Sequence, residues 1–72
     1  MKLTEREKDV LQFIIEFKKT NGYSPTVREI AHGINTSSIT HVSEMLLDLE
    51  EKGYLTTKKK SPRTINVIKF IS

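Results

Sequence analysis

Short polar side chains that can hydrogen-bond to other molecules are concentrated between residues 37 and 44 of this 72-residue chain. Serine and threonine hydroxyls and the histidine imidazole can each donate and accept hydrogen bonds. A glutamate carboxylate accepts hydrogen bonds, for instance from the amino group of cytosine. A solvated helix face has a similar composition, but the segment lacks the aromatic or arginine anchors of protein interfaces. We therefore expect it to read base edges, through Ser38, Thr40, His41, Ser43 and Glu44.

Cations are concentrated near the C-terminus instead. Residues 53–72 hold five Lys/Arg and no Asp/Glu, whereas residues 1–52 hold seven Lys/Arg and nine Asp/Glu. A local positive field of this kind attracts polyanions, and phosphate contacts supply affinity without reading sequence. The predicted phosphate contacts are Lys58, Lys59, Lys60 and Arg63. The alternative is that these lysines only protect a strand edge from aggregation.

Two helix N-termini are weaker candidates for phosphate binding. Free backbone N–H groups and the helix dipole attract anions at such ends. Thr26 and Arg28 lie at the first of them, and Ser37 lies at the second. The alternative for both is a capped helix end that binds no ligand, and for Thr26 the two interpretations are equally well supported.

Three helices are expected to position these side chains. A capping box from Thr4 to Glu7, followed by apolar residues at three- and four-residue spacings, predicts a helix from about residue 5 to about residue 20. Gly22 can end it in the left-handed conformation. A second capping box, from Thr26 to Glu29, predicts a short helix that ends near Gly33.

The third predicted helix covers about residues 38–52, with Ser37 or Ser38 as its N-cap and Gly53 as its stop. Its predicted apolar stripe consists of Ile39, Val42, Met45 or Leu46, and Leu49. In the turn before it, Asn35 is the expected pivot, because asparagine tolerates a positive φ.

Two β-prone segments, 54–57 and 64–68, flank the basic residues and predict a hairpin with a basic loop. A short helix, a tight turn, a longer helix and a hairpin form a winged helix-turn-helix. The expected fold is therefore mainly α with a small β-hairpin, as one domain over residues 1–72. In such units the second helix lies in the major groove of double-stranded DNA.

Other functions find little support in the composition. The chain has no cysteine, and its two histidines, His32 and His41, have no partners at metal-ligand spacing. We recognise no nucleophile–base pair or phosphate loop, so we expect no enzyme activity, metal or cofactor. The charged N-terminus and the absence of a long apolar run lead us to expect a cytoplasmic protein.

Several segments together resemble the N-terminal DNA-binding domain of the LexA family, the repressors of the bacterial DNA-damage (SOS) response. The most specific is Gly22-Tyr23-Ser24-Pro25-Thr26-Val27-Arg28-Glu29-Ile30, supported by Leu3-Thr4, Glu51-Lys52-Gly53 and Pro62-Arg63-Thr64-Ile65. The resemblance implies a repressor that binds inverted-repeat operators as a dimer. It places the family's base-reading positions at Ser38, Thr40, His41, Ser43 and Glu44, with Asn35 where a glycine is common.

LexA proteins continue into a second domain that carries a dimer interface, a self-cleavage site and a Ser-Lys catalytic pair. These 72 residues include none of it, so we expect this chain not to cleave itself. An alternative interpretation is a winged-helix module that binds a protein, such as an antirepressor or a small phage-like regulator. Phe70 and Ile71 would then provide an apolar contact for a partner or for a dimer.

Overall fold

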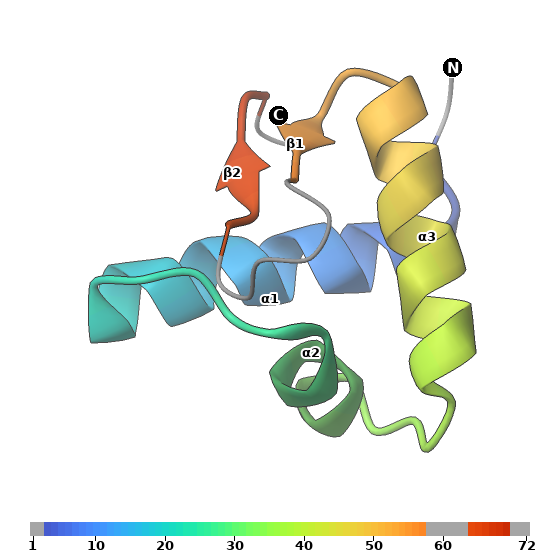
Figure 1. The fold of residues 1–72 in the computed structure, drawn as a ribbon, viewed down its shortest axis with the longest axis horizontal. Coiled ribbons are helices and arrows are strands. Elements are labelled where there is room, and N and C mark those ends of the chain that lie inside the picture. The colour runs from blue at the N-terminus through green and yellow to red at the C-terminus, as the bar shows by residue number, and fades with distance from the viewer. Residues whose placement is uncertain (1–2, 58–63, 70–72) are drawn as a thin grey trace.

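A computed structural model describes residues 3–57 and 64–69 of the chain (Figure 1). Three helices, α1 (Glu5–Asn21), α2 (Val27–Gly33) and α3 (Ile39–Glu51), precede two strands, β1 (Leu55–Thr56) and β2 (Asn66–Val67). The strands pair antiparallel, with Leu55 opposite Val67. The predicted fold class, a three-helix winged helix-turn-helix with a small hairpin, is confirmed.

The first helix begins and ends as its sequence predicts. Thr4 Oγ1 accepts from the Glu7 N–H at 3.1 Å, and Glu7 Oε1 accepts from the Thr4 N–H at 2.9 Å. At the other end Gly22 has φ 82°, and its N–H donates to the Lys18 carbonyl at 2.8 Å. These caps satisfy backbone groups that the helix itself leaves without partners.

The core lies where the three helices and the small sheet meet. α1 contacts α2, α3 and β2, while α3 also contacts β1. Apolar residues at helical spacing bring one face of each helix to this centre. The fully or nearly fully buried apolar side chains are Val10, Leu11, Ile14, Ile30, Ala31, Ile34, Val42, Met45, Leu46, Leu49, Leu55 and Ile65. Within the described residues no helix has both the length and the apolar composition needed to cross a bilayer.

The strands are shorter than the β-prone segments, with two residues each. The register places Thr57 and Ile65 at non-hydrogen-bonded positions, so their backbone groups point away from the partner strand and can bond elsewhere. The Thr57 N–H donates to Glu50 Oε2 of α3 at 3.4 Å. The Ile65 carbonyl accepts from the Ser24 hydroxyl in the loop between α1 and α2. This bond attaches the start of β2 to the helices.

Candidate nucleic-acid interface

A Schellman turn sets the direction of the chain between α2 and α3. Asn35 has φ 63°, the positive value expected for the pivot. The Thr36 N–H donates to the Ala31 carbonyl at 2.9 Å, and the Asn35 N–H donates to the His32 carbonyl at 3.2 Å. This pair of bonds defines the motif, which usually places glycine at the left-handed position. Asparagine occupies it here at a tolerable cost.

Helix α1 supports the same turn from within the molecule. The Arg6 guanidinium donates to the Ile34 carbonyl at 2.6 Å, and it also pairs with Asp9 at 3.6 Å. At the end of α2, a Cβ on Gly33 would lie 2.1 Å from Cε2 of Phe13, so only glycine lets the Phe13 ring pack this closely. The turn that aims α3 is therefore fixed to α1 by a charged hydrogen bond and by close packing.

Ser38, not Ser37, is the N-cap of α3. Its hydroxyl accepts from the His41 N–H at 3.1 Å, and its own N–H donates to Thr36 Oγ1 at 3.3 Å. The Ser38 hydroxyl still has a proton to donate to another molecule. Ser37 is exposed in the turn. The structure thus decides between the two N-caps that the sequence allowed.

The five predicted base-reading residues all lie in the first half of α3 or at its cap. Ser38, Thr40, His41 and Glu44 are exposed, whereas Ser43 is half-buried. The opposite face of the helix is buried in the core through Val42, Met45, Leu46 and Leu49. The structure therefore places four of these side chains on an accessible surface and Ser43 at its margin.

One residue of the predicted apolar stripe was assigned wrongly. Ile39 is 40% exposed rather than packed in the core. Side chains on a helix point toward its N-terminus, so Ile39, at the first helical position, lies over the exposed turn instead of over a preceding helical turn. Leu47 is 48% exposed two turns further on, which the sequence analysis missed. Spacings of four residues place Ile39, Ser43 and Leu47 in one row along α3.

The N-terminus of α2 is already occupied by its capping box. The Thr26 N–H donates to Glu29 Oε1 at 2.8 Å, and Thr26 Oγ1 accepts from the Glu29 N–H at 3.2 Å. These two N–H groups are therefore engaged, and the carboxylate places negative charge where a phosphate would bind. Arg28 is exposed one residue into the helix. Of the two phosphate candidates at this end, Arg28 is the better placed.

The remaining predicted phosphate contacts, Lys58, Lys59, Lys60 and Arg63, lie outside the described residues, as do Phe70 and Ile71. Helix α3 contains no Lys or Arg but carries Glu44, Asp48 and Glu51 on exposed positions. Phosphate neutralisation, if it occurs beside α3, must come from cations outside this helix.

An ion pair fixes the far end of α3 to the start of α1. Lys52 Nζ, at the C-cap of α3, lies 2.7 Å from Oε1 of the buried Glu7. Burial raises the pKa of the Glu7 carboxyl, but hydrogen bonds from Lys52 and Thr4 and the charge of Lys52 outweigh it. The net effect is a pKa below the ordinary value of 4.5. The C-terminal end of α3 and the turn that precedes this helix are thus both attached to α1.

The family model described as the LexA DNA binding domain matches residues 1–64. This chain belongs to the LexA DNA-binding domain family. The LexA repressor of Desulforamulus reducens is 47% identical over 66 residues, which are 92% of this chain and 31% of that protein. The LexA repressor of Thermotoga petrophila is 44% identical over 72 residues, covering 96% of this chain and 34% of the relative.

The LexA repressor of Carboxydothermus hydrogenoformans is 39% identical over 66 residues, which are 92% of this chain and 32% of the relative. The chain therefore spans about a third of the length of these relatives. The LexA resemblance found in the sequence motifs is confirmed, and it covers the helix-turn-helix and the start of β2.

Proposed function

We propose that this LexA-family domain binds double-stranded DNA in a sequence-specific manner and represses transcription, with α3 in the major groove. One observation carries the proposal: the first half of α3 is polar and exposed on one face, while its other face is buried in the core. The major groove admits one helix and shows a distinct donor and acceptor pattern for each base pair. The relatives, which are named LexA repressors, support the regulatory role.

Thr40, His41 and Glu44 are the main base-reading residues in this proposal. All three are exposed and follow the N-terminus of α3, the part of a recognition helix that meets base edges. Ser38 contributes chiefly a donor, because one of the two lone pairs of its hydroxyl oxygen already accepts from the His41 N–H. Ser43 contacts bases at the margin of the surface. Ile39, exposed beside them, is suited to the methyl group of thymine.

Phosphate contacts supply most of the affinity in this account. The cations that provide them follow β1 in the sequence, and the helix-turn-helix itself adds Arg28, Ser37 and Thr26. Those cations are Lys58, Lys59, Lys60 and Arg63. Thr26 contributes least, because its N–H is held by Glu29. A single domain has a small contact surface, so we propose that two copies bind an inverted-repeat operator, each reading one half-site.

Selection from a random pool of DNA duplexes tests this function. The purified chain should enrich one short motif, arranged as an inverted repeat. A variant with Thr40→Ala, His41→Ala and Glu44→Ala should retain its circular dichroism spectrum and weak binding at low salt, but should enrich no motif. A matched control with Lys8→Ala, Gln12→Ala and Glu16→Ala, on the exposed side of α1, should enrich the original motif. Enrichment of the same motif by the α3 variant would exclude the proposal.

A further inference from the structure

A groove lies between α1 and β2, on a part of the molecule that the DNA proposal does not use. Its volume is about 340 Å³, and it is lined by Ile14, Ile15, Lys18, Lys19 and Val67. Ile14 forms the floor with the half-buried Ile15 and Val67. Ile68, the next residue along the chain, is 57% exposed. An apolar floor with a charged rim is typical of an interaction surface rather than of a solvated face.

The edge of β2 that borders this groove has no partner strand among residues 3–57 and 64–69. The Ile68 N–H donates to the Tyr54 carbonyl at 2.8 Å, so Ile68 points its backbone groups to β1. Backbone groups of successive residues in a strand point to opposite edges. The N–H and carbonyl of Val67 therefore face away from β1, in a sheet whose described strands number two. An unpaired edge of this kind is a template for another strand.

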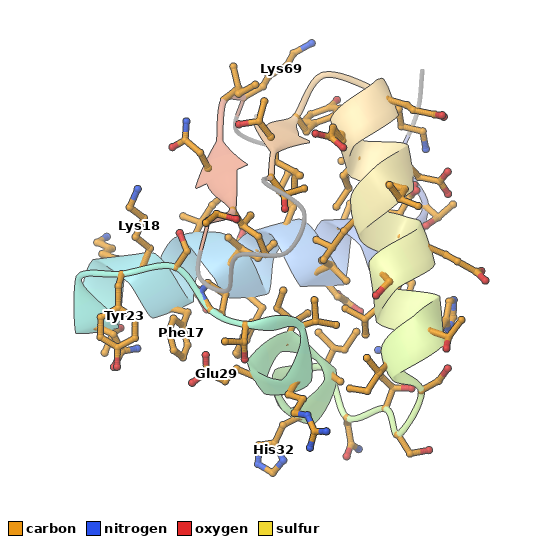
Figure 2. All side chains as sticks on the ribbon, in the orientation of Figure 1. Phe17, Lys18, Tyr23, Glu29, His32 and Lys69 are labelled. Atoms are coloured by element: carbon orange, nitrogen blue, oxygen red, sulfur yellow. The ribbon has the colours of Figure 1, made fainter. Side chains whose placement is uncertain are left out.

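The charges around the groove have one sign. Lys18 and Lys19 line it, and Lys69 follows β2, where its Nζ lies 5.2 Å from the centre of the Tyr54 ring. Figure 2 shows Lys18 extending from α1 on the side where β2 lies, with Lys69 beyond the end of the strand. No acidic side chain is among the residues that line this groove in the described part of the chain.

We infer that β2 and this groove receive an extended segment of a partner protein that alternates apolar and acidic side chains. Its backbone pairs with Val67, as in strand addition. Alternate side chains of a strand point to opposite faces, so the apolar ones face α1 and lie on Ile14 and Ile15. The acidic ones lie on the outer face of the added strand, where the long Lys18 and Lys19 side chains can reach them from the rim of the groove. A second copy of this chain fits less well, because pairing β2 with itself would bring the same lysines together. Phosphates fit less well, because they would cover an apolar floor.

This surface is separate from the proposed DNA contact. In Figure 1, β1 lies between β2 and α3. The residues that line the groove belong to α1 and β2, and none of them belongs to α3. The inference thus adds a protein partner to the DNA-binding function and does not depend on it. A partner bound here can accompany the domain on DNA.

Titration of the labelled chain with short peptides, followed by nuclear magnetic resonance of the backbone amides, tests the inference. The probe is a capped eight-residue peptide of alternating valine and glutamate. We expect shifts centred on the Val67 amide and slower hydrogen exchange of that N–H. A valine–lysine peptide should produce neither effect. Lys18→Glu should weaken binding of the glutamate peptide about tenfold, since one attraction becomes a repulsion.

Lys8→Glu is the matched control, because it makes the same charge change on an exposed position of the same helix. Lys8→Glu should leave the affinity for the glutamate peptide unchanged. If Lys18→Glu alters the circular dichroism spectrum, Lys18→Gln provides a milder variant. An unchanged Val67 amide at millimolar peptide, or equal effects of both peptides, would overturn the inference. A Val67 shift that depends on protein concentration alone would also overturn it, because it would indicate that a second copy of the chain binds here. Displacement of the peptide by a random DNA duplex would overturn it too, because it would indicate that DNA binds here.

Discussion

Asn35 determines the angle at which α3 leaves α2, because it is the one residue with a positive φ in the turn. The left-handed conformation costs an ordinary L-residue about 1–2 kcal/mol, whereas glycine adopts it freely. We expect Asn35→Ala to lower the free energy of unfolding by about that amount. Asn35→Gly should change it by less than about 1 kcal/mol.

Urea unfolding monitored by circular dichroism measures both Asn35 variants. Their comparison separates backbone strain from loss of the side chain, since both remove the amide. Equal stabilities of the alanine and glycine variants would show that the conformation at residue 35 does not control the turn.

Glu44 is the residue whose chemistry most narrowly limits the base it can read. As an acceptor it fits the amino group of cytosine, and a good direct contact is worth about 1–3 kcal/mol of discrimination. We expect Glu44→Gln to weaken binding to the selected site about tenfold or more and to change the preference at one base position per half-site.

Fluorescence anisotropy titrations with single-base variants of the site measure this change for Glu44→Gln. Glu51→Gln removes an equal charge from an exposed position at the other end of α3 and should preserve the preference. An unaltered preference in Glu44→Gln would remove this residue from the reading surface.

At the residue scale, local chemistry made several features predictable. The capping threonines and Asn35 act through hydrogen bonds and dihedral angles within a few residues, so their types and spacing sufficed. Ile39 was assigned wrongly because helical periodicity does not indicate how far the neighbouring elements extend. Its exposure depends on what covers the first turn of α3, which only the tertiary structure shows.

At the scale of the elements, the Glu7–Lys52 ion pair attaches the C-terminal end of α3 to α1. Removing the charge of Glu7 deprives the Lys52 ammonium of the carboxylate that lies 2.7 Å from it. We expect Glu7→Gln to lower the free energy of unfolding by roughly 1.5–3 kcal/mol near neutral pH, the range for hydrogen bonds to charged groups.

The pH dependence of this effect has a definite sign. The pKa of Glu7 is lower in the folded state than its ordinary value of 4.5. Its contribution is therefore fully present above pH 4.5 and is lost as the pH falls through the folded-state pKa. Urea unfolding of the wild-type chain and of Glu7→Gln should be compared from neutral to acid pH. The greater free energy of unfolding of the wild type should disappear in acid. An advantage that is independent of pH would contradict the assigned charge state.

The helices were predictable to within about a residue, because caps and apolar spacing act locally. The strands were overestimated, since β propensity indicates which residues suit a strand but not where backbone pairing ends. Contacts from Arg6 to Ile34 and from Lys52 to Glu7 join residues 28 and 45 positions apart. No periodicity in the sequence indicates such pairs, although they fix the turn before α3 and the C-terminal end of that helix.

At the scale of the whole molecule, positive charge is separated along the chain from the helix proposed to read bases. Helix α3 has no cation, and residues 58–60 are three consecutive lysines. Each phosphate that a cation neutralises contributes about −0.9 to the slope of log K against log salt. We expect replacement of Lys58, Lys59 and Lys60 by glutamine to reduce that slope by up to about 2.7.

The selected motif should be the same in the lysine variant, because phosphate contacts position the protein without reading sequence. Affinity titrations at several salt concentrations, combined with a second random-site selection, test both parts. An unchanged slope would exclude these lysines from the phosphate contacts. The sequence alone led to this division of roles, since charge runs are visible without a structure.

The placement of α3 in the major groove is tested most directly by a cleavage reagent attached to that helix. The chain has no cysteine, so Asp48→Cys, on the exposed side of α3 one turn beyond Glu44, provides a single attachment site for an iron chelate. On the selected duplex we predict cleavage on both strands with the 5′ offset of a major-groove source. Glu16→Cys, on the exposed side of α1, should produce little cleavage. A 3′ offset, which marks the minor groove, or stronger cleavage from position 16 than from position 48, would contradict the account.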